Sequence, residues 1–332
     1  MPSFCRHNRL LQNCPICTRE QSVDMRPVVS SATPRVSEPR PAHEVSRGET
    51  RARSATRARG AGAGMRVRRL VRGEDDGFRT SLAPGLRSSA DAERLAEELA
   101  FAARRLTVLE THPPGLYAEV AGDGDVEERA WLAFLIAYLS PLEDSEDPFA
   151  AISAVRTTWA SGEFPDLDGV EVGPRTAYDP ARGAETLRAY RTWAERAGSQ
   201  EAAFTGELAW SAERRFDRVF ERLALPGLGR EARYELLVLL GRLGVFDMRG
   251  GRLHLVGDNE TTVAAKRALG IGDPMLLERR AADLAVACGV PLEALDLGLF
   301  NWGTGQRVYA GLSPDEEADG SLIAACRAAL GL

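Results

Sequence analysis

The chain has 332 residues, and its 44% share of hydrophobic residues is ordinary for a globular protein. The longest apolar run, residues 131–139, is too short to cross a membrane, and the polar, basic start does not resemble a signal peptide. The cysteines do not indicate a secreted disulfide scaffold. We therefore expect a cytoplasmic protein with no membrane partner, built as one large domain or two small ones.

Charge is unevenly distributed along the chain. Residues 1–72 carry 15 arginines and 5 acidic residues, whereas the rest of the chain carries 27 basic and 43 acidic residues. A basic segment beside an acidic body favours a nucleic-acid partner, although a solvated, arginine-rich linker has the same composition. Lysine occurs once, at Lys266, against 41 arginines, which makes Lys266 a candidate functional residue.

The first 18 residues contain four possible metal ligands, arranged as C-x-H followed by C-x-x-C: Cys5, His7, Cys14 and Cys17. Zn²⁺ prefers four sulfur or nitrogen ligands in a tetrahedral shell. We therefore predict a structural zinc knuckle over residues 1–18. The four ligands leave no open position for catalysis, and the alternative is a mobile terminus with incidental cysteines.

The composition changes after the knuckle. Residues 19–64 are rich in Arg, Ser, Pro, Ala and Gly, which predicts a disordered basic linker, and residues 65–332 are expected to form one helical domain. Helical patterns begin at residue 89 and at residue 291 and also cover 126–139, 149–159, 184–196, 210–223, 232–243, 260–269 and 274–288. The pattern over 126–139 is apolar nearly all round, so that helix is expected to be central.

One segment departs from the helical pattern. Residues 244–256 alternate around Gly250 and Gly251, which predicts a small β-hairpin inserted between helices. Cys288 and Cys326 fall within helical patterns and are expected in the core. Because helices dominate, the predicted fold class is all-α.

A short turn with the sequence L-A-L-P-G-L-G joins two helical patterns at residues 223–229. The proline and first glycine end one helix, and the backbone N–H groups at the start of the next face outward, where they can bind phosphate. Such a contact holds the DNA backbone and does not read sequence. The predicted DNA-binding residues of this hairpin are Pro226, Gly227, Leu228, Gly229 and Arg230. An ordinary αα-hairpin with a glycine turn is the alternative.

Three stretches together resemble the helix-hairpin-helix DNA glycosylases. They are residues 135–140 (L-I-A-Y-L-S), the hairpin turn, and residues 257–270, G-D-N-E-T-T-V-A-A-K-R-A-L-G. The resemblance implies a glycosylase-like helical fold in which the last stretch is a helix that starts with a catalytic aspartate, here Asp258. Glu231 stands where lyase-type members of that superfamily carry a lysine, and the inserted segment lengthens the gap between the turn and the aspartate.

The chain is more similar still to one branch of this superfamily, the α-glutamyl/putrescinyl-thymine pyrophosphorylases of clade 3. The residues that carry this resemblance are F-C-R-H-N-R at 4–9, A-A-K-R at 264–267, I-G-D-P at 271–274 and L-F-N-W-G at 299–303. It implies hypermodification of a DNA base, in which an amine or amino acid displaces pyrophosphate from a pyrophosphorylated 5-hydroxymethylpyrimidine.

Candidate catalytic residues follow from that chemistry. A carboxylate at Asp258 can accept a proton from the amine or position it, although Asp also caps helices well at such a place. Lys266 and Arg267 can stabilise a departing pyrophosphate, or they form a solvated helix face. Asp247 is a further candidate carboxylate, in a place that is also ordinary for a surface aspartate.

Asn301 and Trp302 are candidates for contact with an extruded base, while core packing is the alternative role for the tryptophan. Three functions stay open at this point: an aminating DNA-modification enzyme, a monofunctional DNA glycosylase, and a non-catalytic DNA-binding module. The acidic body argues against a pure DNA clamp.

Overall fold

A computed structural model describes residues 73–314, 316 and 318–332. The zinc knuckle predicted over residues 1–18 and the basic linker predicted over residues 19–64 lie outside the described residues, and so do the first residues of the predicted helical domain. Within the described residues, no helix is both long and apolar enough to span a membrane.

The described part of the chain forms helices and no strands, which confirms the predicted all-α class. The helices are α2 (Ser89–Thr111), α3 (Leu116–Ala121), α4 (Val126–Leu139), α5 (Ala150–Val155), α6 (Gly183–Ala197), α7 (Gln200–Thr205), α8 (Ala212–Arg222), α9 (Arg230–Arg242), α10 (Glu260–Leu269), α11 (Pro274–Cys288), α12 (Ala294–Thr304) and α13 (Gly320–Leu330).

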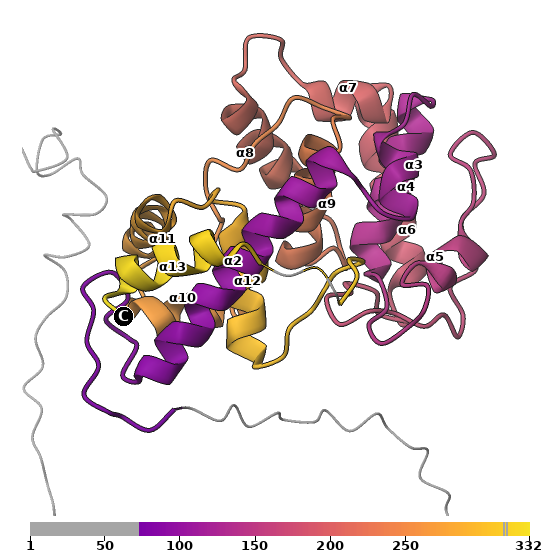
Figure 1. The fold of residues 1–332 in the computed structure, drawn as a ribbon. Helices are drawn as coiled ribbons and strands as arrows, with labels where there is room; N and C mark the ends of the chain where they lie inside the picture. Colours follow the sequence, from indigo (N-terminus) through magenta and orange to yellow (C-terminus); the bar gives the residue numbers. More distant parts are fainter. Residues whose placement is uncertain (1–72, 315, 317) are drawn as a thin grey trace, which may run out of the picture. The chain divides into compact units, whose positions relative to one another are not determined.

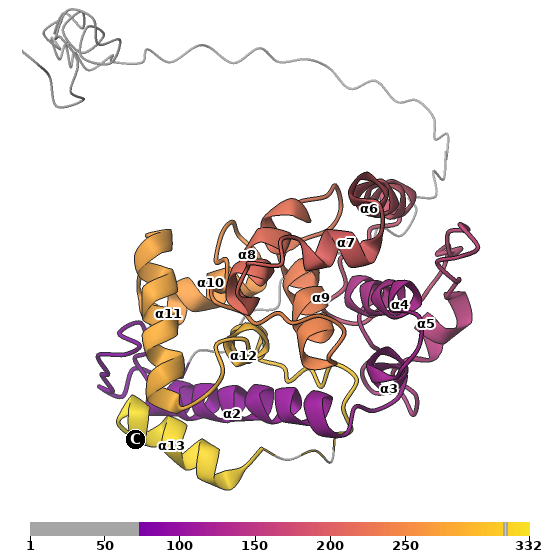
Figure 2. The same cartoon turned by 90° about the horizontal axis from the view of Figure 1, so that it is seen from above.

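The helices pack in two groups that do not follow chain order (Figures 1 and 2). Helix α2 packs against α12 and α13, and α10 and α11 complete this first group. The middle of the chain, α3 to α9, forms the second group, in which α4 packs against α9. Contacts between α2 and α9 join the two groups, so the chain leaves the first group after α2 and returns to it at α10.

Helix α4 is central to the second group, as its apolar sequence predicts. Asp125 caps its N-terminus by accepting a hydrogen bond from the backbone N–H of Glu127, and the helix ends at Ser140, which has a φ of 62°. Every residue from 130 to 139 except Leu132 is buried. Its aromatic side chains stack with Tyr190 of α6, the Phe134 and Tyr190 ring centroids being 3.8 Å apart. Each buried side chain of this size contributes about 1.5–3 kcal/mol relative to exposure.

The predicted β-hairpin at residues 244–256 is wrong, because this segment forms no strand. Glu278 of α11 accepts hydrogen bonds from the backbone N–H groups of Leu253 and Leu255, at 2.8 and 2.5 Å. Glu293 accepts another from Gly250, at 3.0 Å. These carboxylates take the backbone donors that a partner strand would otherwise take, so the alternating pattern reflects burial against helices.

Other differences from the sequence expectations are local. The helix predicted over 149–159 is shorter, and α3 and α7 were not predicted, whereas α13 covers the helical pattern expected at Cys326. Helices α3 and α7 have six residues each, a length that is marginal in isolation, so tertiary packing rather than sequence pattern holds them. Cys288 and Cys326 are both buried, as expected.

Candidate functional site

The predicted hairpin is present in the structure. Ser211 caps α8 through its side chain, which accepts a hydrogen bond from the backbone N–H of Arg214. The chain then turns between α8 and α9 with a hydrogen bond from the N–H of Leu228 to the carbonyl of Leu225, at 3.2 Å. Gly227 has a φ of +74°, a conformation that glycine adopts without the steric cost of a side chain. The two helices and the tight turn therefore form as the sequence indicates.

The two glycines of the turn have different surroundings. A Cβ atom on Gly227 would lie 2.0 Å from Oγ1 of Thr186, so this glycine lets the turn pack closely on α6. Gly229 is exposed, and a Cβ atom there would have nothing within 4 Å. Gly229 is also the N-cap residue of α9, and no side chain caps that helix. The first amides of α9 thus begin at an open, glycine-lined surface.

Arg230 does not lie on this surface, which corrects its assignment to DNA binding. Its side chain is 6% exposed, and its guanidinium donates to a carboxylate oxygen of Asp296 and to the carbonyl of Leu253. The guanidinium also lies 4.6 Å from the centre of the Tyr234 ring. A buried carboxylate needs a cation or strong donors close by, and Arg230 supplies them from the first residue of α9. Leu228 is buried as well, whereas Pro226 is exposed.

Arg230 is one end of a buried chain of alternating charges. Arg105 of α2 lies 2.5 Å from Glu235 of α9. Glu235 lies 3.1 Å from Arg175. Arg175 in turn lies 2.5 Å from Asp296 of α12. Burial alone would raise the pKa of Asp296, but Arg230 and Arg175 outweigh it and hold that pKa below its ordinary value. These ion pairs cross the junction between the two helix groups, so they link α9 of the hairpin to α2 and α12 of the first group.

Glu231 connects the hairpin to α10. One carboxylate oxygen accepts hydrogen bonds from the backbone N–H and the hydroxyl of Thr261, at 3.1 and 3.2 Å. Thr261 is in the first turn of α10, and Glu231 is in the first turn of α9. The N-terminal turns of these two helices therefore lie side by side.

The residue that caps α10 is Asn259 and not Asp258, which corrects the expectation that the helix starts with the aspartate. The Asn259 side chain accepts a hydrogen bond from the backbone N–H of Thr262, at 3.0 Å. The Asp258 side chain is 96% exposed, and one of its oxygens lies 3.7 Å from Nζ of Lys266. Lys266 also donates to the carbonyl of Gly257, at 3.0 Å. The half-buried Lys266, in the last turn of α10, therefore pairs with the exposed Asp258, which precedes the helix.

Asn301 and Trp302 are both buried, which is the core position that the sequence left open as the alternative for the tryptophan. The amide of Asn301 donates to Glu98 and to the carbonyl of Val308, at 3.1 and 3.3 Å, within a buried environment. Trp302 is buried, and its indole N–H donates to a carbonyl of α2. Arg267 lies with its guanidinium 4.4 Å from the centre of the Trp302 ring.

Asp247 is also apart from the hairpin turn. Its carboxylate is 82% exposed and lies 3.2 Å from Nη1 of Arg215. Arg215 is in the first turns of α8, at the end of that helix remote from the turn. The structure therefore joins the hairpin to the start of α10 through Glu231 and Thr261, close in sequence to Asp258, and leaves Asp247 at the other end of α8.

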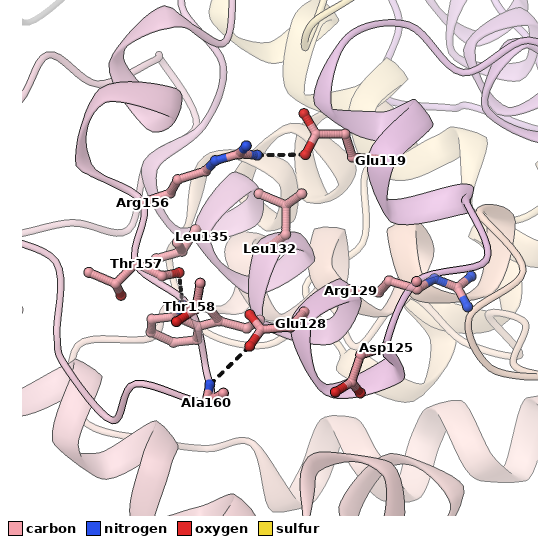
Figure 3. A pocket seen from close by; sticks show the side chains of 12 residues that line it. Glu119, Asp125, Glu128, Arg129, Leu132, Leu135, Arg156, Thr157, Thr158 and Ala160 are labelled. Carbon is pink, nitrogen blue, oxygen red and sulfur yellow. Dashed lines mark hydrogen bonds and ion pairs between the residues drawn. The ribbon is translucent and has the colours of Figure 1, made fainter.

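Two hollows among the described residues do not coincide with the hairpin. One has a volume of about 470 Å³ and lies between α3, α4 and the segment after α5 (Figure 3). Leu132 lies between an ion pair of Arg156 with Glu119, 2.6 Å apart, and Glu128, which accepts a hydrogen bond from the N–H of Ala160. The other, of about 610 Å³, is lined in part by Arg267 and Trp302.

No protein-family model, no curated protein and no solved structure matches this chain. The resemblance carried by the short motifs therefore stays a prediction. Sequence reasoning noted Glu231 only as a departure from a pattern and missed its contact with Thr261. The preference of asparagine for N-caps was the available signal for Asn259.

Proposed function

We propose that this protein binds DNA through the hairpin and the start of α10 and aminates a pyrimidine base there. The helical domain would then be of the helix-hairpin-helix glycosylase type. The observation that carries the proposal is the contact of Glu231 with Thr261, because it holds two helix N-termini side by side at one surface. Helix N-termini favour anions, so two of them together suit a phosphate backbone.

The open surface at Gly229 supports a backbone grip. A phosphate can approach the first amides of α9 closely, since no side chain caps the helix and the glycine has no Cβ atom. Backbone amides contact phosphate and do not read bases, so this contact would hold any DNA duplex independently of its sequence. A structural zinc at Cys5, His7, Cys14 and Cys17, with the basic linker, would add sequence-independent affinity, and those residues lie outside the described part of the chain.

The chemistry would take place at the Asp258–Lys266 pair beside the grip. An amine or amino acid attacks the methylene carbon of a pyrophosphorylated 5-hydroxymethylpyrimidine, a carbon–nitrogen bond forms, and the carbon–oxygen bond to pyrophosphate breaks with its electron pair on the leaving oxygen. Lys266 would neutralise charge on the departing pyrophosphate. Asp258, 3.7 Å from Lys266, would position the incoming amine. Asp258 is exposed and Lys266 is half-buried, so the carboxylate is fully and the ammonium partly accessible to substrates.

Lyase-type glycosylase chemistry has less support. Glu231 replaces the lysine that would form a Schiff base, and its carboxylate is occupied by Thr261. The amide of Asn259, at the start of α10, has no charge to stabilise an oxocarbenium-like sugar. Base excision without lyase activity is an outcome that the assay below would detect.

DNA binding is tested with the substitution Gly229→Val. Because nothing lies within 4 Å of the added atom, the fold should be unchanged while the phosphate is blocked. We expect the affinity for duplexes to fall at least tenfold and equally for unrelated sequences, measured by fluorescence anisotropy at fixed salt. Gly320→Val, at another glycine with open space around it, is the control. Equal affinity of the Gly229→Val variant and the wild type would remove the hairpin from the interface.

The reaction is tested by incubating DNA that bears pyrophosphorylated 5-hydroxymethylpyrimidines with the protein and a set of amines. Mass spectrometry of the digested nucleosides distinguishes the functions. An aminated nucleoside together with released pyrophosphate supports the proposal. Free base and abasic sites would establish a glycosylase instead, and unchanged DNA with intact binding would leave a DNA-binding module.

A further inference from the structure

A histidine and an aspartate face each other beside the hairpin. Nε2 of His254 lies 2.9 Å from Oδ1 of Asp217, which is on α8, the first helix of the hairpin. His254 is in the loop between α9 and α10, directly after Leu253, whose carbonyl accepts from Arg230. The pair therefore sits between the hairpin and the Asp258–Lys266 pair along the same loop.

The backbone at His254 is held in an uncommon conformation. Its φ is 54°, in the left-handed region, which costs a non-glycine residue about 1–2 kcal/mol. Glu278 holds the N–H groups of both flanking residues, Leu253 and Leu255. Together with the contact of Arg230 with the Leu253 carbonyl, three hydrogen bonds with charged side chains hold the backbone on either side of His254. Backbone conformations that are strained and held by several surrounding contacts are common at functional sites.

The ring of His254 is also fixed. It stacks on Phe220 of α8 with a centroid distance of 4.0 Å and an interplanar angle of 15°. The guanidinium of Arg233 lies 4.5 Å from the centre of the same ring, so Phe220 is sandwiched between the two groups. His254 is only 7% exposed, and the orientation of its ring is therefore set by packing as well as by Asp217.

The contact with Asp217 defines the protonation pattern of the imidazole. An ionised carboxylate only accepts hydrogen bonds, so Nε2 of a neutral His254 must carry the proton and Nδ1 must carry the lone pair. Arg252 lies 3.6 Å from the other oxygen of Asp217. Nδ1 of His254 has no hydrogen-bond partner within the described residues. It is not one of the fully buried side-chain atoms that lack a partner, so it is not sealed from solvent.

We propose that Asp217 and His254 are the proton-accepting pair of the hairpin site. This inference rests on the proposed amination. As the amine nitrogen bonds to the methylene carbon and pyrophosphate leaves with the electron pair of the broken bond, a proton of that nitrogen moves to Nδ1 of His254. Asp217 stabilises the imidazolium through Nε2 and holds the ring in place. His254 is then a catalytic residue and Asp217 a positioning residue.

The kinetic test uses His254→Asn and Asp217→Asn, with His112→Asn as the control. Asparagine tolerates the left-handed backbone of residue 254, so the fold should survive. His112 is exposed and lies in another part of the fold. We expect His254→Asn to lower the amination rate about 10²–10⁴-fold with unchanged DNA affinity. The wild-type rate should fall as the pH is lowered, because imidazolium accepts no proton, and this limb should disappear in the His254→Asn variant.

A second measurement does not depend on turnover. In ¹⁵N NMR spectra of the histidine rings, His254 should have a protonated Nε2 and an unprotonated Nδ1, and duplex DNA should shift its signals while those of His112 stay unchanged. A protonated Nδ1, signals unaffected by bound DNA, or an active His254→Asn variant with the wild-type pH profile would each overturn the proposal. Failure of the wild type to bind DNA would instead overturn the proposed function, and the role of the pair with it.

Discussion

The buried Asp296 offers the most direct test of how the hairpin is held. Its carboxylate contacts Arg175 at 2.5 Å and also accepts from Arg230, and both arginines are buried. The substitution Asp296→Asn keeps the shape and removes the charge. Arg175 retains Glu235, at 3.1 Å, but Arg230 keeps only the carbonyl of Leu253. Removing one partner of a buried ion pair typically costs about 3–5 kcal/mol, because the remaining charge stays buried and uncompensated.

Thermal and urea unfolding measure this loss. For a unit of this size, about 2 °C of melting temperature is lost per kcal/mol, so we expect a decrease of about 6–10 °C. The matched control is Asp75→Asn, which removes the same charge from an ion pair with Arg79 whose side chains are both 52% exposed. Surface pairs contribute about 0–1 kcal/mol, so the control should differ little from the wild type.

The pH dependence gives a second readout. The folded-state pKa of Asp296 is lower than its ordinary value of 3.8, so its contribution to stability is present above that value and is lost as the pH falls through the folded-state pKa. The wild type should lose this part of its stability in acid below about pH 4, and Asp296→Asn should lack it. Adding Arg230→Met to Asp296→Asn should restore part of the stability. A loss below 1 kcal/mol in Asp296→Asn would refute the reasoning.

Three further expectations are independent of that network. Gly227→Ala should destabilise the fold by about 2 kcal/mol in thermal unfolding, because of the positive φ and the contact with Thr186, while Gly229→Ala should change it little. Glu278→Gln should accelerate hydrogen exchange at residues 253 and 255 and cost about 1.5–3 kcal/mol, and unchanged exchange would contradict the role given to this carboxylate. Purified, reduced protein should contain about one zinc per chain, and Cys14→Ser should lose it; metal-free wild type would exclude the knuckle.

Local signals explain the elements that the sequence predicted well. Helices α4, α10 and α11 have the predicted bounds. The last two end at Gly270 and Gly289, both left-handed, and α11 begins with a proline after the cap Asp273. Caps, prolines and left-handed glycines act within a few residues, so a sequence reveals them directly. The hairpin turn was predictable for the same reason.

The errors arose where distant residues decide the outcome. An arginine at the start of a helix beside a glycine turn has every local feature of a phosphate contact. Arg230 is instead buried because Asp296, which lies 66 residues further along the chain, meets it there. The segment at 244–256 alternates like a strand, but Glu278 and Glu293 take its backbone donors. No pattern within either segment indicates these partners.

Glu231 constrains the chemistry of the proposed site. A carboxylate accepts hydrogen bonds from the N–H and hydroxyl of Thr261, and a lysine, which can only donate, would lose both and separate α10 from the hairpin. The position that could supply a protein amine therefore serves to join the two helices. The only lysine of the chain, Lys266, is held by the carbonyl of Gly257 beside Asp258. An amine that reacts at this surface would have to come from solution, which is what the proposed amination requires.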